Sequence, residues 1–434
     1  MTVIGEGTYG CVHKPSLICN KKNITYKNKV SKILSKKSAS KEINEYSAIS
    51  KADKKKEFYL GLPTKCNISR IESNIKSIQH CKDGKEFLED LDNFVLLIME
   101  YGGENLSDYA KRMKKLDATS ENIRKIELFW LEAHRILIGI KRFLDNDLIH
   151  HDLKPQNIVY SESQNRANFI DFGLMQSKKK TIQSCKKSKN WMESAHWSFP
   201  FEVHFLNKNK YMNFAKRSDN EKKEYYKRLI EQFNKKNEDY REIKAMSIFF
   251  TYVLNEDQKK YDELLKDKYF HDYYETLMYE IKPENYPNFL EKSVNTIDLY
   301  GTGIAFMYLL NECKHFIKKP LYEDLLDMFY YILTPNISKR LTIDEAINRY
   351  EEILSNNGIL EKYNKHFENH VLLDGKSVPD MINKKVKEIK TENATIPKTL
   401  LETEAKTHHD PCPKNYTYSN SKKKCVKKYT QKNK

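Results

Sequence analysis

Two stretches of this 434-residue sequence carry side chains that could bind phosphate, hold a metal ion or move a proton. The first runs from Gly5 to Val12 and has the form G-x-G-x-x-G-x-V. Glycine lets backbone N–H groups approach a phosphate closely, because no Cβ intrudes. Dinucleotide-binding sites also carry G-x-G-x-x-G, so this pattern alone is a weak signal. The following Val12, and a continuation that resembles a strand rather than a helix, favour a phosphate loop between two strands.

The second stretch is the run from Leu148 to Asn157, LIHHDLKPQN, which is followed downstream by Ile170-Asp171-Phe172-Gly173. Asp152 could accept the proton of a substrate hydroxyl, and Lys154 could neutralise charge on a phosphoryl group during transfer. Asn157 and Asp171 offer the hard oxygen ligands that Mg²⁺ prefers. Any one of these residues in isolation is better explained as a cap, a turn or a surface lysine. Their occurrence together, in this order, makes that explanation much weaker.

Taken in order, these motifs resemble the eukaryotic protein-kinase family, and D-L-K-P-x-N resembles its Ser/Thr branch. The resemblance covers residues 1 to about 355. It implies an α+β bilobal fold, with a small β-rich lobe at residues 1–101 and a larger helical lobe at 102–360. It also implies a Ser/Thr protein kinase that uses ATP and Mg²⁺ and transfers the γ-phosphate to serine or threonine hydroxyls of proteins. Asp152 and Lys154 would be catalytic, and Asn157 and Asp171 would bind the metal.

The family also has a strand lysine that holds the α- and β-phosphates, and a helix glutamate that pairs with it. Lys32 fits the lysine, with Lys29 as a rival just outside the apolar run. Glu42 fits the glutamate, because apolar residues follow it at the family's spacing, and Glu45 is the alternative.

The remaining nucleotide contacts are also implied by the resemblance. Met99 would be the gatekeeper, and the backbone of residues 100–102 would read adenine. Val30 stands where the family usually has alanine, which would narrow the adenine pocket. The full set expected to contact the nucleotide is Ile4, Gly5, Glu6, Gly7, Thr8, Tyr9, Gly10, Val12, Val30, Lys32, Met99, Glu100, Tyr101, Gly102, Val159 and Ile170.

Later landmarks extend the resemblance into the second half of the chain. The run from Trp197 to Glu202 resembles the A-P-E end of the activation segment, and the run from Asp298 to Gly303 resembles D-x-W-S-x-G. Arg340 matches a late arginine, so we expect a buried ion pair between Arg340 and Glu202.

Three departures from the family pattern carry information. His151 stands where most members have arginine, and a neutral histidine cannot clamp a phosphate, so activity should not depend on phosphorylation of the activation segment. Residues 203–297 form an unusually long, charge-balanced insertion that is either a docking element or a stabilising decoration. The activation segment is basic, which suggests acidic protein substrates. Its lysines are Lys178, Lys179, Lys180, Lys186, Lys187 and Lys189.

Periodicity indicates the elements that must position these residues. Short apolar runs separated by turns predict strands over most of the first hundred residues, with one helical stretch from Ser40 to Ile49. The pattern turns helical from about Leu106, and apolar residues from Ile126 to Leu144 predict one long core helix. Residues 361–434 read as a linker and a basic, partly disordered tail.

Composition places limits on partners and compartment. The net charge is +16, and residues 411–434 contain eight lysines and no acidic residue, which leaves nucleic-acid binding by the tail open. Eight cysteines without a C-x-x-C pair suggest reduced thiols in a cytoplasmic compartment, not a secreted protein. No apolar run reaches the length of a membrane span. No feature indicates an oligomeric state.

Two further hypotheses come from the chain as a whole. The tail of the form C-P-(x)n-C, the start G-T-Y-G-C-V and the Lys- and Asn-rich composition resemble protein kinases of large nucleocytoplasmic DNA viruses, which would place the chain in host cytoplasm or a virion. The alternative to an enzyme is a pseudokinase that serves as a scaffold or binding module. That alternative requires a missing catalytic residue, and Lys32, Asp152, Asn157 and Asp171 are all present.

Overall fold

The computed structural model describes residues 1–7, 10–20, 23–189, 196–254, 259–363, 416–419 and 424–427. The chain divides into one compact unit at Met1–Glu361 and another at Lys362–Lys434. In the second unit, β11 (Tyr416–Ser419) pairs antiparallel with β12 (Lys424–Lys427), a hairpin that the sequence analysis did not predict. Among the residues described, no helix has the length and apolar character needed to cross a membrane.

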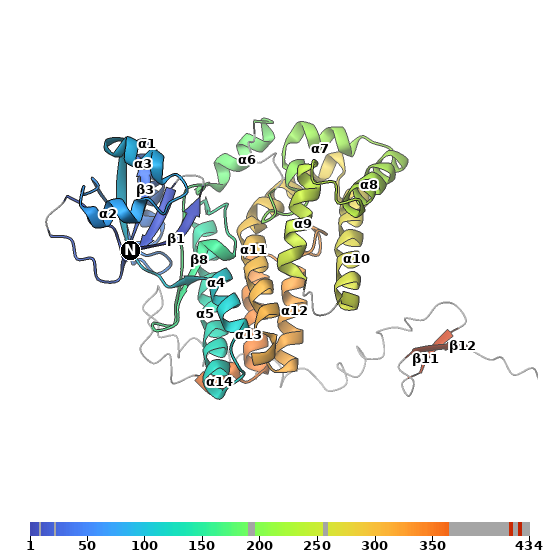
Figure 1. The fold of residues 1–434 in the computed structure, drawn as a ribbon. Helices are drawn as coiled ribbons and strands as arrows, with labels where there is room; N and C mark the ends of the chain where they lie inside the picture. The colour runs from blue at the N-terminus through green and yellow to red at the C-terminus, as the bar shows by residue number, and fades with distance from the viewer. Residues whose placement is uncertain are drawn as a thin grey trace, which may run out of the picture. The chain divides into compact units, whose positions relative to one another are not determined.

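The N-terminal lobe is built on a five-stranded antiparallel sheet in the order β1-β2-β3-β5-β4. Figure 1 shows this lobe in blue. Its strands are β1 (Thr2–Gly7), β2 (Gly10–Lys14), β3 (Lys29–Ser35), β4 (Thr64–Cys66) and β5 (Phe94–Glu100). The register places Lys32 opposite both Val12 and Leu97, and Val30 opposite Met99. Residues expected to touch the nucleotide therefore meet across the middle of one sheet.

Helices pack on both faces of this sheet. Because successive strand residues point to opposite faces, Leu34 packs with Leu97 beneath α1 (Lys36–Ala52), whereas Ile33 packs with Leu96 on the other side. That second face is covered by α2 (Glu72–Ile78) and α3 (Gly84–Glu89). The sequence analysis predicted only the first of these helices. The other two contain seven and six residues, too few for helical periodicity to stand out.

One expectation about the cysteines is wrong. Cys11 and Cys81 form a disulfide, although the sequence suggested reduced thiols throughout. The two residues are 70 positions apart, and only the packing of α2 against the sheet brings their Cα atoms to 6.0 Å, within disulfide range. Cys19, Cys185 and Cys313 are buried thiols.

The C-terminal lobe is mostly helical and centres on two long helices, α5 (Ser120–Asp145) and α11 (Tyr286–Glu312). The apolar stripe predicted between Ile126 and Leu144 is the buried side of α5. Helix α11 contacts α5 and is also flanked by α4 (Leu106–Lys114), α9 (Arg241–Val253) and α12 (Lys319–Leu333) (Figure 1). The lobe ends with α13 (Ile343–Asn356), which packs on α5 and α12, and α14 (Ile359–Tyr363).

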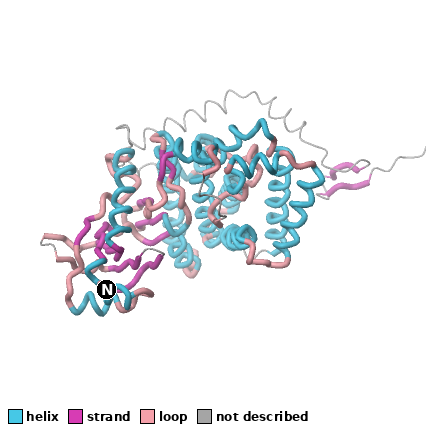
Figure 2. Tube along the Cα trace, turned by 90° about the horizontal axis from the view of Figure 1, so that it is seen from above, coloured by secondary structure: helices cyan, strands magenta, loops and turns pink. Residues whose placement is uncertain are grey.

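Short strands at the edge of this lobe hold the chemical motifs. β6 (Glu104–Asn105), β8 (Ile158–Ser161) and β9 (Arg166–Phe169) form one small sheet, and β7 (Leu148–Ile149) pairs with β10 (Gln176–Ser177) in another. The catalytic stretch lies between β7 and β8, with residues 155–157 in a 3₁₀ turn. Figure 2 shows strands, in magenta, gathered on the side of the N-terminus, and helices, in cyan, over most of the rest of the first unit.

The described part of residues 203–297 is mostly helical, as predicted, and contains α7 (Lys208–Ala215), α8 (Asp219–Asn234), α9 and α10 (Lys259–Glu275). The structure differs at the C-terminal edge of this region. Helix α11 already begins at Tyr286, so Asp298 lies well inside a helix. A π-helical turn at Thr276–Glu280 and a 3₁₀ turn at Pro283–Asn285 separate α10 from α11.

Candidate active site

A lysine, a glutamate and an aspartate meet at the boundary between the lobes. Lys32 on β3 extends its Nζ to 2.8 Å from Oε2 of Glu42 on α1 and 4.0 Å from Oδ1 of Asp171. Burial lowers the pKa of Lys32, but the charges of Asp171 and Glu42 outweigh it and hold the pKa above its usual value. The ammonium is therefore charged and fixed in position, ready to receive an anionic ligand.

The rival residues lie elsewhere. Lys29 pairs with Glu100 at the C-terminal end of β5, where its Nζ lies 2.5 Å from Oε1. Glu45 lies one turn beyond Glu42 and pairs with Lys41 across 3.7 Å on the same helix. Burial, opposed by Lys41 and reinforced by Glu42 and Asp171, raises the pKa of Glu45 to about 7. Neither rival contributes to the Lys32 cluster at bonding distance.

The catalytic stretch is organised around Asp152. Lys154 Nζ lies 2.9 and 2.8 Å from the two carboxylate oxygens of Asp152, and Asn157 Nδ2 donates to Oδ2 and to the main-chain oxygen, each at 2.8 Å. The amide of Ile170 donates to the main-chain oxygen of Asn157 at 3.1 Å, so Asp171 follows directly from this network. The two stretches found in the sequence thus meet in space.

Asp298 fixes the backbone of this loop by accepting hydrogen bonds from two of its amides. Its Oδ2 accepts the His150 amide at 2.6 Å and its Oδ1 accepts the His151 amide at 2.8 Å, while the side chain is buried in α11. One helical turn on, a Cβ at Gly301 would lie 2.1 Å from the main-chain oxygen of Leu153. The sequence analysis used both residues only as landmarks, because their contacts with the loop cross about 150 positions.

Asp171 adopts a left-handed backbone conformation, with φ at +61°. Such a conformation is costly for a residue other than glycine and is commonly retained where function requires it. Its side chain is 46% exposed, whereas the next residue, Phe172, is buried against Tyr46 and His150, each with ring centroids 5.2 Å away. Phe172 is therefore packed in the core, while the carboxylate of Asp171 stays half-exposed to solvent.

The expected nucleotide contacts lie on both sides of this cluster. Gly10 must be glycine, because a Cβ there would lie 2.0 Å from the main-chain oxygen of Ile33. Val30 and Val159 are buried, whereas Ile4 lies in a bulge between β1 and β2 and is exposed. Thr8 and Tyr9 lie outside the described residues.

Other members of that set have partners within the protein. The Glu6 carboxylate accepts the Lys82 amide at 2.6 Å, Met99 Sδ accepts the Tyr46 hydroxyl at 3.7 Å, and Tyr101 lies under the ammonium of Lys14. Gly5 and Gly7 lie on β1, opposite Val12 and Gly10. Gly102 packs so closely to Val159 that a Cβ would come within 2.6 Å.

A divalent cation fits the donors that this site offers. Asp171 provides a half-exposed carboxylate, and Asn157 provides a buried amide fixed by Asp152. Hard oxygen ligands of this kind suit Mg²⁺, which also keeps several waters.

The activation segment is held in place by Asp147, which lies just before β7. Asp147 accepts the Ser177 hydroxyl at 2.6 Å and the Lys179 amide at 2.9 Å, and its main-chain oxygen accepts the Lys178 amide. These bonds fix the start of α6 (Lys178–Lys186). Nothing in the sequence marked Asp147 as important.

His151 occupies the position where the family usually has arginine. Its ring stacks on Phe199 at 5.1 Å, and Gln176 Nε2 lies 2.9 Å from its Nδ1. Burial, with a smaller effect from His150 and His196, lowers the pKa of His151 to about 3. The side chain is therefore neutral at pH 7.

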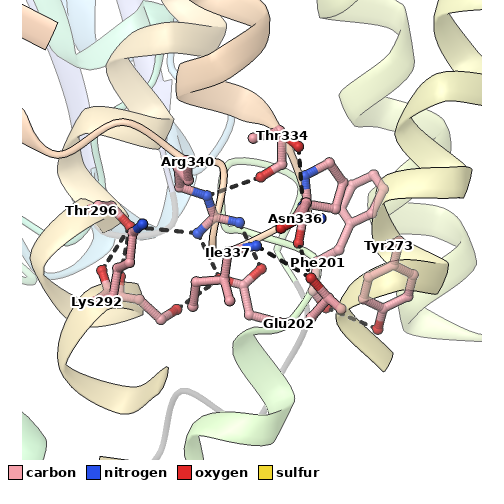
Figure 3. Close-up of polar contacts among 12 residues, drawn as sticks. Phe201, Glu202, Tyr273, Lys292, Thr296, Thr334, Asn336, Ile337 and Arg340 are labelled. Carbon is pink, nitrogen blue, oxygen red and sulfur yellow. Dashed lines mark hydrogen bonds and ion pairs between the residues drawn. The ribbon is translucent and has the colours of Figure 1, made fainter. Parts of the chain in front are cut away.

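The predicted ion pair between Glu202 and Arg340 is confirmed. Arg340 Nη1 and Nη2 lie 2.6 and 2.9 Å from the two carboxylate oxygens, and both side chains have no exposed surface (Figure 3). Arg340 Nε also donates to the Thr334 main-chain oxygen, and Ser293 donates to Glu202. Each charge thus has a further hydrogen-bond partner besides the other, which helps to offset the cost of burying the ion pair.

Helix α9 contacts the site directly. Tyr252 accepts a hydrogen bond at 2.8 Å from Gln156 in the catalytic stretch and stacks on Trp197 at 4.4 Å. On the same helix, Phe249 is buried between Phe201 and Tyr300. At least this part of the region 203–297 belongs to the core beside the active site.

Comparison with known proteins agrees with this geometry. Residues 1–212 match the family described as the protein kinase domain. The chain is 33% identical over 92 residues to "Probable serine/threonine-protein kinase mps1" of Dictyostelium discoideum, covering 21% of this chain and 8% of that protein. It is 44% identical over 43 residues to "Probable cell division control protein 7 homolog 2" of Encephalitozoon cuniculi (strain GB-M1), covering 10% of this chain and 12% of that protein.

The chain therefore spans only about a tenth of the length of these curated relatives. Its α+β bilobal architecture, with an N-terminal antiparallel sheet followed by a mostly helical lobe, is the protein-kinase fold predicted from the sequence. The fold, the family match over residues 1–212 and the relatives together support similarity to eukaryotic-type protein kinases.

Proposed function

We propose that this protein is a Ser/Thr protein kinase that transfers the γ-phosphate of ATP to hydroxyl groups of protein substrates. The observation that carries the proposal is the joint placement of two arrangements. Lys32 is paired with Glu42 and lies 4.0 Å from Asp171, and Asp152 is tied to Lys154 and Asn157. Protein kinases need both arrangements in place at once.

Each residue has a role that follows from its position. Asp152 would orient the substrate hydroxyl and accept its proton, and Lys154 would neutralise charge on the phosphoryl group. Lys32, held by Glu42, would bind the α- and β-phosphates. Asn157 and Asp171 would hold Mg²⁺, which neutralises charge on the phosphates when bound.

The nucleotide would lie between the lobes, under the strands of the glycine-rich motif. Its contacts would come from the set predicted above, with the backbone of residues 100–102 reading adenine beside Met99. The support is the register that places Val30 opposite Met99 and Val12 opposite Lys32.

The surface beside the catalytic loop favours an acidic protein substrate. Lys179, Lys180, Lys186 and Lys187 are exposed on and just after α6, and residues 178–189 contain no acidic residue. Opposite charges on a substrate would be attracted to this surface and oriented by it. The preference for serine or threonine rests on the D-L-K-P-x-N motif and on the names of the relatives.

The direct test is Mg²⁺-dependent transfer of labelled γ-phosphate from ATP to one acidic and one basic model protein. Asp152→Asn should lower turnover by at least about a hundredfold, since a positioned general base contributes that much or more. Asp145→Asn, at the exposed end of α5, is the matched control and should leave turnover unchanged. Preference for the basic protein would contradict the proposed substrate class.

The competing function is a pseudokinase that serves as a scaffold. It predicts that ATP binds but that neither the chain nor either model protein is phosphorylated, whatever residue stands at position 152. The intact set of Lys32, Asp152, Asn157 and Asp171 argues against it. The viral origin and the cytoplasmic or virion location remain predictions from the sequence.

A further inference from the structure

We propose that Cys11 and Cys81 form a reversible thiol–disulfide pair, assisted by His13, that clamps the glycine-rich strands of the N-terminal lobe. The pair is closed as a disulfide in the structure. Cys11 lies on β2 between Gly10 and Val12, and Cys81 lies in the turn between α2 and α3. The link thus joins the strand that follows the glycine-rich motif to a turn on the covered face of the sheet.

His13 is placed to act on Cys81. It lies two residues beyond Cys11 on the same strand, so both side chains point to the same face, and both are buried. His13 Nε2 lies 3.6 Å from Cys81 Sγ and 3.2 Å from the main-chain oxygen of Ser77. In the tautomer with the hydrogen on Nδ1, Nε2 can accept the proton of the Cys81 thiol, and the protonated Nε2 can then donate to the Ser77 main-chain oxygen until the proton is passed on.

Neutral histidine is the form that can accept this proton. Burial lowers the pKa of His13, with smaller opposing effects from the Ser77 hydrogen bond and from Glu6. The titratable groups that act on it are Glu6, His80 and the amino group of Met1. An apolar cluster raises the pKa of a thiol, so a neighbouring base is what would make Cys81 reactive.

A second contact ties the same turn to the glycine-rich motif. The amide of Lys82, next to Cys81, donates to the carboxylate of Glu6 at 2.6 Å, and Glu6 lies between Gly5 and Gly7 on β1. The turn at residues 79–83 therefore holds both strands of the motif, one through a hydrogen bond and one through the disulfide. When the disulfide is reduced, only the hydrogen bond between Lys82 and Glu6 still joins this turn to the motif.

The reaction requires a small disulfide such as oxidised glutathione. The Cys81 thiolate attacks one glutathione sulfur, which forms a mixed disulfide and releases one glutathione thiolate that takes the proton from His13. The Cys11 thiolate then attacks Cys81 Sγ and releases the second glutathione, which takes the Cys11 proton. Two protein thiols become one disulfide, and one oxidised glutathione becomes two reduced ones. His80 and Lys82 are exposed, so local opening of this turn suffices for access.

The first experiment counts thiols and needs no ATP. The full chain is equilibrated in glutathione buffers of increasing oxidised fraction and alkylated, and peptides carrying each cysteine are measured by mass spectrometry. Cys11 and Cys81 should convert together and reversibly, whereas Cys19, a buried thiol in the same apolar cluster, should stay reduced. Separate conversion of the two, or closure only in denaturant, would overturn the proposal. So would retention of zinc by the reduced chain, because Cys11, His13 and Cys81 also offer three metal ligands within 4.8 Å of one another.

The second experiment tests His13. His13→Gln should slow closure by oxidised glutathione about tenfold at pH 7, and the difference should vanish near pH 9.5, where thiols ionise unaided. A purely structural role for His13 would slow closure equally at both pH values, which would contradict its assignment as the base.

The consequence for nucleotide rests on the proposed kinase function. A clamped motif is already ordered for binding, so reduction should weaken ATP binding about threefold or more, and Cys81→Ser should behave like the reduced chain in either buffer. Cys19→Ser is the matched control and should keep the redox response. Equal ATP affinity in the two redox states would refute the clamp even if the disulfide forms, whereas failure of phosphoryl transfer alone would bear only on the proposed function.

Discussion

Glu45 is a carboxyl group whose surroundings favour its neutral form. It lies on α1 near Glu42 and Asp171, and burial with these neighbours raises its pKa to about 7. A carboxyl with a folded-state pKa above its unfolded value stabilises the fold below about pH 4.5 and loses that contribution as pH rises through 7. At pH 8 the Glu45 carboxylate is charged, and keeping this charge in the folded protein lowers the free energy of unfolding.

Glu45→Gln should therefore raise the free energy of unfolding at pH 8 by about 1 to 2 kcal/mol, with little effect at pH 4.5, because one pKa unit corresponds to about 1.4 kcal/mol and the site is partly solvated. Thermal or urea unfolding at the two pH values measures this. Glu42→Gln is the comparison and should lower activity, since it breaks the pair with Lys32. A stabilisation of Glu45→Gln that is equal at both pH values would contradict the electrostatic explanation.

The start of the proposed activation segment is held by contacts within the protein. Asp147 caps the start of α6, and His151, neutral at pH 7, stacks on Phe199. Neither contact needs a phosphorylated residue. We therefore expect a chain treated with phosphatase to keep full turnover with ATP and protein substrate.

Asp147→Ala should remove that support and lower turnover, while Asp145→Ala, two positions earlier in an exposed place, should not. Turnover is compared before and after phosphatase for all three proteins, with phosphate content followed by mass spectrometry. A loss of turnover in the wild-type chain that returns on rephosphorylation would refute phosphate-independent activity.

Helix α11 and the catalytic loop pack so closely that only glycine fits at position 301. Gly301→Ala would place a Cβ 2.1 Å from the Leu153 main-chain oxygen, which must shift the loop that carries Asp152. We expect turnover to fall about tenfold or more, since displacements of about 1 Å are costly in catalysis. Thr302→Ala, the neighbouring position on the same helix, controls for general loss of stability, and thermal unfolding is measured for both. Unchanged turnover in Gly301→Ala would show that the loop tolerates the shift.

The stability of the helical lobe depends on a link between distant parts of the chain. Glu202 and Arg340 are 138 positions apart and form a fully buried bidentate pair that joins the end of the activation segment to the turn before α13. Glu202→Gln leaves the arginine charge buried without its counter-charge and should destabilise the fold by about 3 to 5 kcal/mol. Replacing both residues, Glu202→Gln with Arg340→Met, should cost clearly less. Urea unfolding of the single and double variants tests this, and equal losses would contradict the charge argument.

The basic C-terminal segment suggests a separate prediction for the whole chain. If residues 411–434 bind nucleic acid through their eight lysines, the chain should be retained on DNA at low salt and released as salt rises. Deletion of 411–434 should abolish retention, while phosphoryl transfer should persist, because all the proposed active-site residues come before position 172. Retention by the truncated chain would assign it to another surface.

The local pattern of residues was enough to predict the two motif stretches, the long helix α5 and the helical character of residues 203–297. Such features depend on neighbours within a few positions, which the sequence displays directly. The protein-kinase fold followed because motif order constrains the path of the chain between the motifs. The buried pair of Glu202 and Arg340 was predictable for the same reason, once the intervening landmarks were recognised.

Other features depend on contacts between residues far apart in the chain. Helices α2 and α3, the disulfide between Cys11 and Cys81, the capping of α6 by Asp147 and the contact of Tyr252 with Gln156 leave no periodic signal. In the disulfide and the two side-chain contacts, burial of apolar surface brings together residues that are about 30 to 100 positions apart in the chain, and only then are they close enough to bond. The sequence analysis favoured Lys32 over Lys29 because Lys29 lies outside the apolar run, and in the structure the strand register places Lys32, not Lys29, beside Glu42.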